Sequence, residues 1–135
     1  EAAVGCAQIE NLNFFVEKKR EIQQFYKKEL GNIKGISFFP EPEWAKSSCW
    51  FSGIVIDDLN EEKMSHLIQK FAGQGVMIRP FWMPIHLQPN FKDCERSDLS
   101  CSENIWKKIV VLPCSTNITE TELEKVSSTV HNILS

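Results

Sequence analysis

The fold of this chain is decided by the stretch Gly75 to Phe91, which reads Gly-Val-Met-Ile-Arg-Pro-Phe-Trp-Met-Pro-Ile-His-Leu-Gln-Pro-Asn-Phe. Its first residues alternate, so that Val76 and Ile78 fall on one face of an extended chain and Arg79 falls on the other. This alternation predicts a strand with one buried face. Pro80 is expected to end the strand, because proline has no N–H for a sheet ladder and restricts the residue before it.

The residues after the strand form a loop that two further prolines stiffen. Arg79, Trp82 and His86 offer a cation, an indole and an imidazole, and Gln88 adds an amide. A rigid loop that presents such groups is typical of a ligand site. An ordinary proline-rich loop whose aromatic rings fill a core explains the same residue types.

The loop also carries a family resemblance. Its segment Arg79 to Phe91 resembles the R-x-x-W-x-P-x-H-x-x-P-x-[YF] segment of the DegT/DnrJ/EryC1/StrS family, which comprises pyridoxal-phosphate-dependent aminotransferases of nucleotide-linked keto-sugars. Further stretches resemble family motifs in order and spacing: Ala2–Leu12, Lys19–Tyr26, Ser102–Glu103 and Leu112–Pro113. Asn13 stands where the family commonly has aspartate. The resemblance covers nearly all of this chain but only the C-terminal part of a family member.

This resemblance implies a fold class of the α/β (α+β) type. We expect the C-terminal small domain of a fold-type-I pyridoxal-phosphate transferase, with a long N-terminal helix and a small, mainly antiparallel sheet covered by helices. It also implies pyridoxal phosphate as cofactor, a nucleotide-linked sugar and an amino-acid donor as substrates, and a homo-oligomer. The family's Schiff-base lysine lies upstream of the matched region, so we assign no catalytic residue and expect the chain alone to be inactive.

The resemblance further implies three substrate-binding residues. Arg79 is expected to pair with a carboxylate or phosphate, because its guanidinium binds such anions through two parallel hydrogen bonds. His86 is expected to contact a sugar hydroxyl or the cofactor phosphate, and Trp82 to stack on a sugar face. Each has a structural alternative: a salt bridge for Arg79, a loop-ordering role for His86 and a core position for Trp82.

Composition excludes several function classes. The 135 residues are 42% hydrophobic and 24% charged, and 15 basic against 18 acidic residues give a net charge of −3. This balance argues against a nucleic-acid partner, and no apolar run approaches a membrane span. Five cysteines, scattered and without a C-x-x-C pair, favour a reduced cytoplasmic protein. His86, Cys94, Cys101 and Cys114 match no standard zinc spacing, so we predict no metal site.

We expect one domain over residues 1–135. A helix from Ala2 to Leu30 would be roughly 40 Å long, more than a compact domain of this size requires. Its first residues are apolar or small around the whole helical circumference. We therefore expect residues 1–31 to form a long helix that packs on a larger cofactor-binding domain absent from this sequence.

The remaining elements follow from local signals. Strands are predicted at Ile36–Phe39, Cys49–Ile56 and Ile109–Leu112 from β-branched and aromatic residues. Asn60 and Thr119 are predicted to cap helices, and Ser100 with Glu103 is predicted to form a capping box.

Two other functions remain open from the sequence. The alternative is a stand-alone, non-catalytic binding or regulatory module that has the same fold. It is also compatible with a structural interaction domain.

Overall fold

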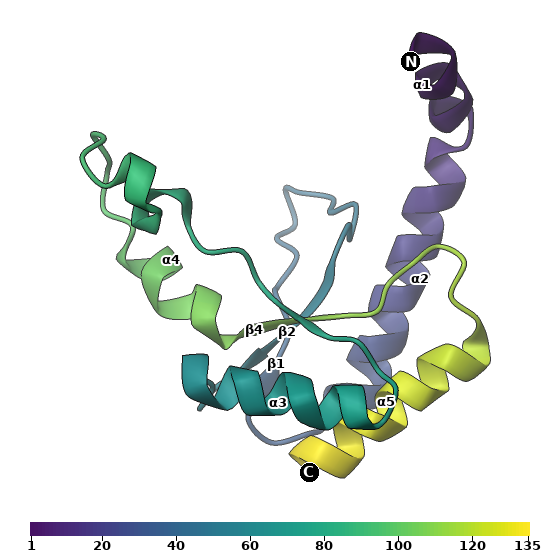
Figure 1. Cartoon of the computed structure of the whole chain (residues 1–135). Coiled ribbons are helices and arrows are strands. Elements are labelled where there is room, and N and C mark those ends of the chain that lie inside the picture. The colour runs from purple at the N-terminus through teal and green to yellow at the C-terminus, as the bar shows by residue number, and fades with distance from the viewer.

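Helices and four short strands make up most of the chain in the computed structural model, which describes residues 1–135 (Figure 1). The α-helices are α1 (Ala2–Glu10), α2 (Leu12–Leu30), α3 (Glu61–Gly73), α4 (Ser100–Ile105) and α5 (Glu120–Leu134). The strands are β1 (Ile36–Ser37), β2 (Ser52–Ile56), β3 (Arg79–Pro80) and β4 (Ile109–Leu112). Single 3-10 turns are η1 (Ile85–Leu87), η2 (Pro89–Phe91) and η3 (Trp106–Lys108).

The strands form one antiparallel sheet in the order β1-β2-β4-β3. Its centre is the β2–β4 pair, in which Ile54 lies opposite Val110. Strand β3 is an edge strand, and Arg79 pairs there with Val111. The mixed helical and antiparallel architecture expected from the sequence is confirmed.

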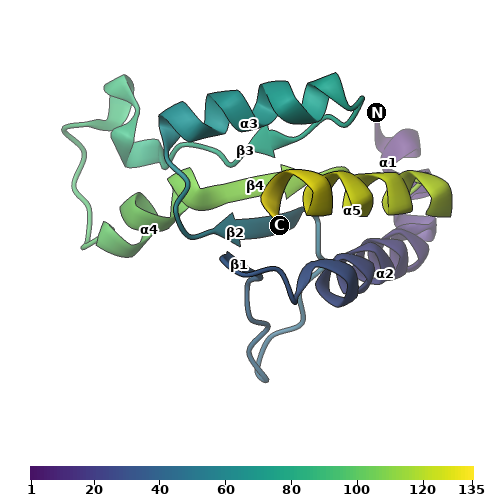
Figure 2. The ribbon, with the colours of Figure 1, turned by 90° about the horizontal axis from the view of Figure 1, so that it is seen from below.

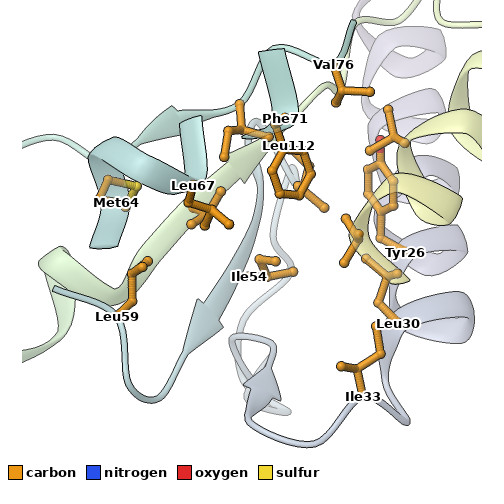
Figure 3. Packing of buried hydrophobic residues seen from close by; sticks show 14 of the residues in the cluster. Tyr26, Leu30, Ile33, Ile54, Leu59, Met64, Leu67, Phe71, Val76 and Leu112 are labelled. Carbon is orange, nitrogen blue, oxygen red and sulfur yellow. The ribbon is translucent and has the colours of Figure 1, made fainter. Parts of the chain in front are cut away.

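Helices α3 and α5 cover one face of the sheet, and α2 packs beside α5 (Figure 2). The core lies between them, because alternate strand residues point to this side. Figure 3 shows the rings of Tyr26 and Phe71 converging with Ile54 and Leu112 in this layer, and all four are essentially inaccessible to solvent. Apolar side chains of α3 and α5, among them Met64, Leu67, Val126 and Val130, belong to the same core.

The predicted long helix is divided in two at Asn11. This residue leaves helical geometry, with φ −103° and ψ 5°, and its side-chain Nδ2 donates to the Ala7 carbonyl over 3.0 Å. Asparagine favours such local bonds over helix interiors, which accounts for the break. Helix α1 has no buried residue and extends away from the body of the molecule (Figure 1).

The strand predicted after Gly75 is shorter and placed later than expected. Val76 and Ile78 are buried and Arg79 is exposed, as the alternation predicted. Ladder pairing is confined to Arg79 and Pro80, so the strand ends at Pro80 as predicted, although Pro80 itself still pairs with Val110. An edge strand tolerates proline, because one side of it needs no ladder partner.

Two of the three predicted helix caps are present. Asn60 accepts a hydrogen bond from the Lys63 amide, and Thr119 with Glu122 forms a complete capping box. The capping box predicted for Ser100 and Glu103 is wrong. Asp98 accepts from the Ser100 amide instead, and the Glu103 carboxylate is bound elsewhere.

The face of the sheet opposite α3 and α5 carries no helix of the core layer. Three segments border this face: the loop between β1 and β2, the segment from η1 to α4, and the α1–α2 arm (Figure 1). Side chains from these three segments line one of the cavities described next. The fold therefore packs one sheet face and leaves the other available for a site.

Candidate functional site

The motif residues of α2 hold this helix against the segment that follows β4. The Tyr26 hydroxyl donates to the Pro113 carbonyl over 2.7 Å, and Lys19 donates to the Cys114 carbonyl over 2.5 Å and to the Trp50 carbonyl over 3.1 Å. Burial raises the pKa of Tyr26 far above its ordinary value of 10.0, and nearby Cys114 adds to the effect. The Lys19–Tyr26 and Leu112–Pro113 motifs are thus structural anchors that meet in space.

Arg79 is exposed on the edge strand and takes part in no salt bridge of the chain. It lines a hollow of about 660 Å³, here called the Arg79 hollow, together with Phe51, Asn117 and Lys125. The salt bridge that served as the structural alternative for Arg79 is absent. Arg79 and Lys125 share the hollow with one carboxylate, that of Glu122, and the excess of positive charge suits an anionic ligand group.

Trp82 belongs to a group of four rings, here called the aromatic cluster, which comprises Trp50, Phe51, Phe81 and Trp82. Its ring lies 5.1 Å from Phe51 in an edge-on arrangement and 5.6 Å from Trp50. Trp82 is nevertheless 61% exposed and Trp50 is 62% exposed. Trp82 is therefore not a core residue, and its ring is accessible to a ligand.

His86 is buried in η1, and its Nε2 lies 2.9 Å from Oε1 of Glu103 on α4. The imidazole does not line the Arg79 hollow. This pair fastens the proline loop to α4, the geometry that the loop-ordering alternative requires. Gln88 is exposed and only reaches the Met83 carbonyl, over 3.4 Å.

A second hollow, of about 740 Å³, lies beside the aromatic cluster and is here called the aromatic hollow. Trp50, Phe51 and Trp82 line it from one part of the chain, and Gln23 and Trp106 line it from α2 and η3. Phe51 borders both hollows, so they adjoin at this residue. The sequence had indicated Trp82 here, but not the other residues.

Gln23 carried a signal that reasoning from the sequence missed. It follows Ile22 directly and lies three residues before Tyr26, within the apolar stripe of α2. A polar residue that is buried on such a stripe needs a partner or a function. Trp106, by contrast, gave no such signal, because the sequence indicates only an apolar residue in a short helix at this position.

The cysteines and His86 do not gather into a metal centre. All five cysteines are free, and no group of three potential ligands comes together. His86 is bound to Glu103, whereas Cys114 lies against Lys19 and the Trp50 carbonyl. No helix is long and apolar enough to cross a membrane.

Comparison with known proteins identifies the family. The sequence profile of the DegT/DnrJ/EryC1/StrS aminotransferase family matches residues 1–131. The chain belongs to this family. The matched range includes the Arg79 loop and α2, in agreement with the resemblance seen in the sequence.

Relatives of this chain include proteins named as an aminotransferase and as a nucleotide-sugar synthase. EpsN of Bacillus subtilis, provisionally assigned as a pyridoxal phosphate-dependent aminotransferase, is 34% identical over 129 residues, which are 93% of this chain and 33% of EpsN. GDP-perosamine synthase of Vibrio cholerae is 23% identical over 132 residues, which are 97% of this chain and 36% of the synthase. The chain thus spans about a third of the length of these relatives.

Solved structures share the fold. The aminotransferase TlmJ from Streptoalloteichus hindustanus superposes with a TM-score of 0.82 at 23% identity, covering 97% of this chain and 35% of TlmJ. DesV from S. venezuelae superposes with a TM-score of 0.83 at 16% identity, covering 98% of this chain and 35% of DesV. The fold therefore corresponds to part of a fold-type-I pyridoxal-phosphate aminotransferase.

The lysine of the α2 motif, Lys19, is not available to pyridoxal phosphate. A site for this cofactor requires a free lysine amino group and an acidic partner for the pyridine nitrogen. The amino group of Lys19 is already committed to two backbone carbonyls. No aspartate or glutamate of the chain is buried.

Proposed function

We propose that the protein containing this chain is a pyridoxal-phosphate-dependent aminotransferase of nucleotide-linked keto-sugars. The family match over residues 1–131 carries this proposal. Relatives named GDP-perosamine synthase and dTDP-4-amino-4,6-dideoxy-D-glucose transaminase support the nucleotide-linked sugar as the substrate class. In this proposal an amino acid such as glutamate is the amino donor, and the cofactor supplies the transfer chemistry from a site held mainly by other parts of the protein.

The contribution of this chain is the substrate-facing wall. Arg79 binds an anionic group of the substrate, a role supported by its exposure and by the lack of a salt-bridge partner. Trp82 provides an exposed ring against which a sugar packs. His86 does not contact the substrate, because its imidazole is buried and bound to Glu103. Its role is to position the loop that carries Arg79 and Trp82.

The experiment uses the full-length protein, purified in the presence of pyridoxal phosphate. It is incubated with L-glutamate and a 4-keto-6-deoxy sugar linked to dTDP, GDP or UDP, and the products are identified by mass spectrometry. We expect conversion of at least one keto-sugar to the amino sugar, with release of 2-oxoglutarate. If no keto-sugar is aminated although the cofactor is bound, the proposal is wrong and a non-catalytic binding role becomes the better explanation.

A further inference from the structure

The hydrogen bonds of Lys19 hold its amino group next to a thiol. The Nζ atom lies 3.5 Å from the Sγ atom of Cys114, although the two residues are 95 positions apart in the sequence. The same Nζ donates to the Cys114 carbonyl over 2.5 Å and to the Trp50 carbonyl over 3.1 Å. The nitrogen is therefore fixed beside the sulfur by two bonds to the main chain.

The anchoring role of Lys19 does not account for the thiol. Lys19 holds α2 through main-chain carbonyls, and any residue at position 114 supplies such a carbonyl. The sulfur itself adds only the long contact to Nζ and a bond of 3.7 Å to the Trp50 carbonyl. A thiol is a weak hydrogen-bonding group, and its distinctive property is oxidation.

The sulfur of Cys114 is within reach of a small oxidant. Cys114 is half-buried, and it lines the Arg79 hollow. A molecule of the size of hydrogen peroxide can enter this hollow. The partner nitrogen is already in place beside the sulfur, because the carbonyl bonds of Lys19 hold it there.

We propose that Cys114 and Lys19 form a reversible covalent cross-link when the protein meets hydrogen peroxide. Peroxide transfers one oxygen to the Cys114 thiol, which becomes a sulfenic acid, and its other oxygen leaves as water. Lys19 loses a proton from its ammonium to water, and Nζ then attacks the sulfur. The S–N bond forms as the S–O bond breaks, and the oxygen takes a proton from nitrogen and leaves as a second water. Sulfur is thereby oxidised by two electrons, and peroxide is reduced by two.

The cross-link would change the molecule in two ways. It would tie α2 covalently to the segment that follows β4, and it would remove the positive charge of Lys19. It would also protect the sulfur, because a sulfenic acid without a condensing partner oxidises further to a sulfinic acid. This modification site goes beyond the proposed function and does not depend on amino transfer.

The test treats the full-length protein with hydrogen peroxide, alkylates the remaining thiols and analyses the protein by mass spectrometry. Cleavage after glutamate separates residues 18–21 from residues 104–120, and each peptide contains one of the two partners. We expect the two peptides to be joined, with their summed mass less two hydrogen atoms, and fragment ions to place the bond at Lys19. Dithiothreitol should restore the separate peptides, because it returns the thiol and the amine as it is oxidised to a disulfide.

Four variants sharpen the result. Lys19→Arg keeps the charge but replaces the amine with a guanidinium, and it should lose the joined peptide and yield Cys114 as a sulfinic acid. Cys114→Ser keeps the main-chain carbonyl and should also lose the joined peptide. Lys18→Arg changes the neighbouring lysine, which is bonded to Glu21 over 2.6 Å, and should leave the cross-link unchanged. Cys101→Ser removes an exposed thiol on α4 and should leave it unchanged as well.

Two results would overturn the proposal. One is that peroxide leaves Cys114 as a thiol, a disulfide or a sulfinic acid, without the joined peptide. The other is that the joined peptide persists in Lys19→Arg, or that its bond maps to Lys18. The readout is a peptide mass and not an enzymatic rate, so failure here is distinct from failure of the proposed function.

Discussion

At the residue scale, Arg79 gives the sharpest test of the substrate-facing wall. In the full-length protein, Arg79→Ala should lower kcat/KM by tenfold or more, because a charge-assisted hydrogen bond contributes about 1.5–3 kcal/mol. The melting temperature should change little, since Arg79 is exposed and forms no salt bridge. Steady-state kinetics and thermal unfolding measure the two effects.

Two substitutions serve as controls for this experiment. Arg79→Lys should restore activity only in part, because an ammonium lacks the planar fork of the guanidinium. Arg96→Ala removes an exposed arginine whose side chain reaches only the Lys92 carbonyl, and should leave kcat/KM unchanged. Near-normal activity in Arg79→Ala would remove Arg79 from the substrate-facing wall.

Tyr26 is the only tyrosine of the chain and makes a pH-dependent contribution to stability. Its pKa is raised in the folded state, so the contribution is complete below the unfolded value of 10.0 and is lost as the pH rises above it. At neutral pH, Tyr26→Phe should lower the free energy of unfolding by about 0.5–1.5 kcal/mol, because the bond to Pro113 is lost.

Above pH 10 the difference between the two proteins should narrow. The unfolded tyrosine ionises there and the folded one does not, whereas phenylalanine does not titrate at all. Urea unfolding of the chain from pH 7 to pH 11 measures the effect. Parallel stability curves for both proteins across this range would contradict a buried, un-ionised Tyr26.

At the element scale, the His86–Glu103 pair joins η1 to α4 across 17 residues. Glu103→Ala should lower the free energy of unfolding by about 1–3 kcal/mol, because the imidazole stays buried and loses its partner. The loop between η2 and α4 should also become more sensitive to proteolysis, since its anchor is gone. Urea unfolding and limited trypsin digestion test both expectations.

Glu95→Ala is the matched control for the substitution in the His86–Glu103 pair. Glu95 lies in the same charged segment, is exposed and takes part in no salt bridge. Its substitution should therefore leave stability and digestion unchanged. If Glu103→Ala behaves like Glu95→Ala, the pair does not hold the loop and His86 loses its positioning role.

At the scale of the whole molecule, helix α1 exposes large apolar side chains and has no buried residue. Val4 is 66% exposed and Ile9 is 70% exposed, although both are large apolar residues on a helix without buried positions. Apolar surface of this extent favours association. The isolated chain should therefore self-associate at micromolar concentration, as measured by sedimentation velocity.

Charge placed on α1 should suppress this association. The double substitution Val4→Glu with Ile9→Glu should shift the chain toward monomer, whereas Ser128→Glu on the exposed side of α5 should not. A chain that sediments as a monomer at every concentration, with α1 still helical by circular dichroism, would contradict the expectation.

The sequence alone determined the types of most elements and the family of the chain. Helix α3 and its Asn60 cap, helix α5 and its capping box, and the alternation from Val76 to Arg79 were all predicted. These features depend on residues within about four positions of one another, so local periodicity and hydrogen-bonding preference suffice to indicate them.

Only the tertiary structure decided which side chains meet. Glu103 was expected to cap its own helix and instead binds His86, and Tyr26 reaches Pro113 across 87 residues. The contact between Lys19 and Cys114 became visible only when α2 was placed beside the segment that follows β4. Such pairings depend on how the elements pack and not on local spacing, because each side chain binds whichever group the fold brings within reach.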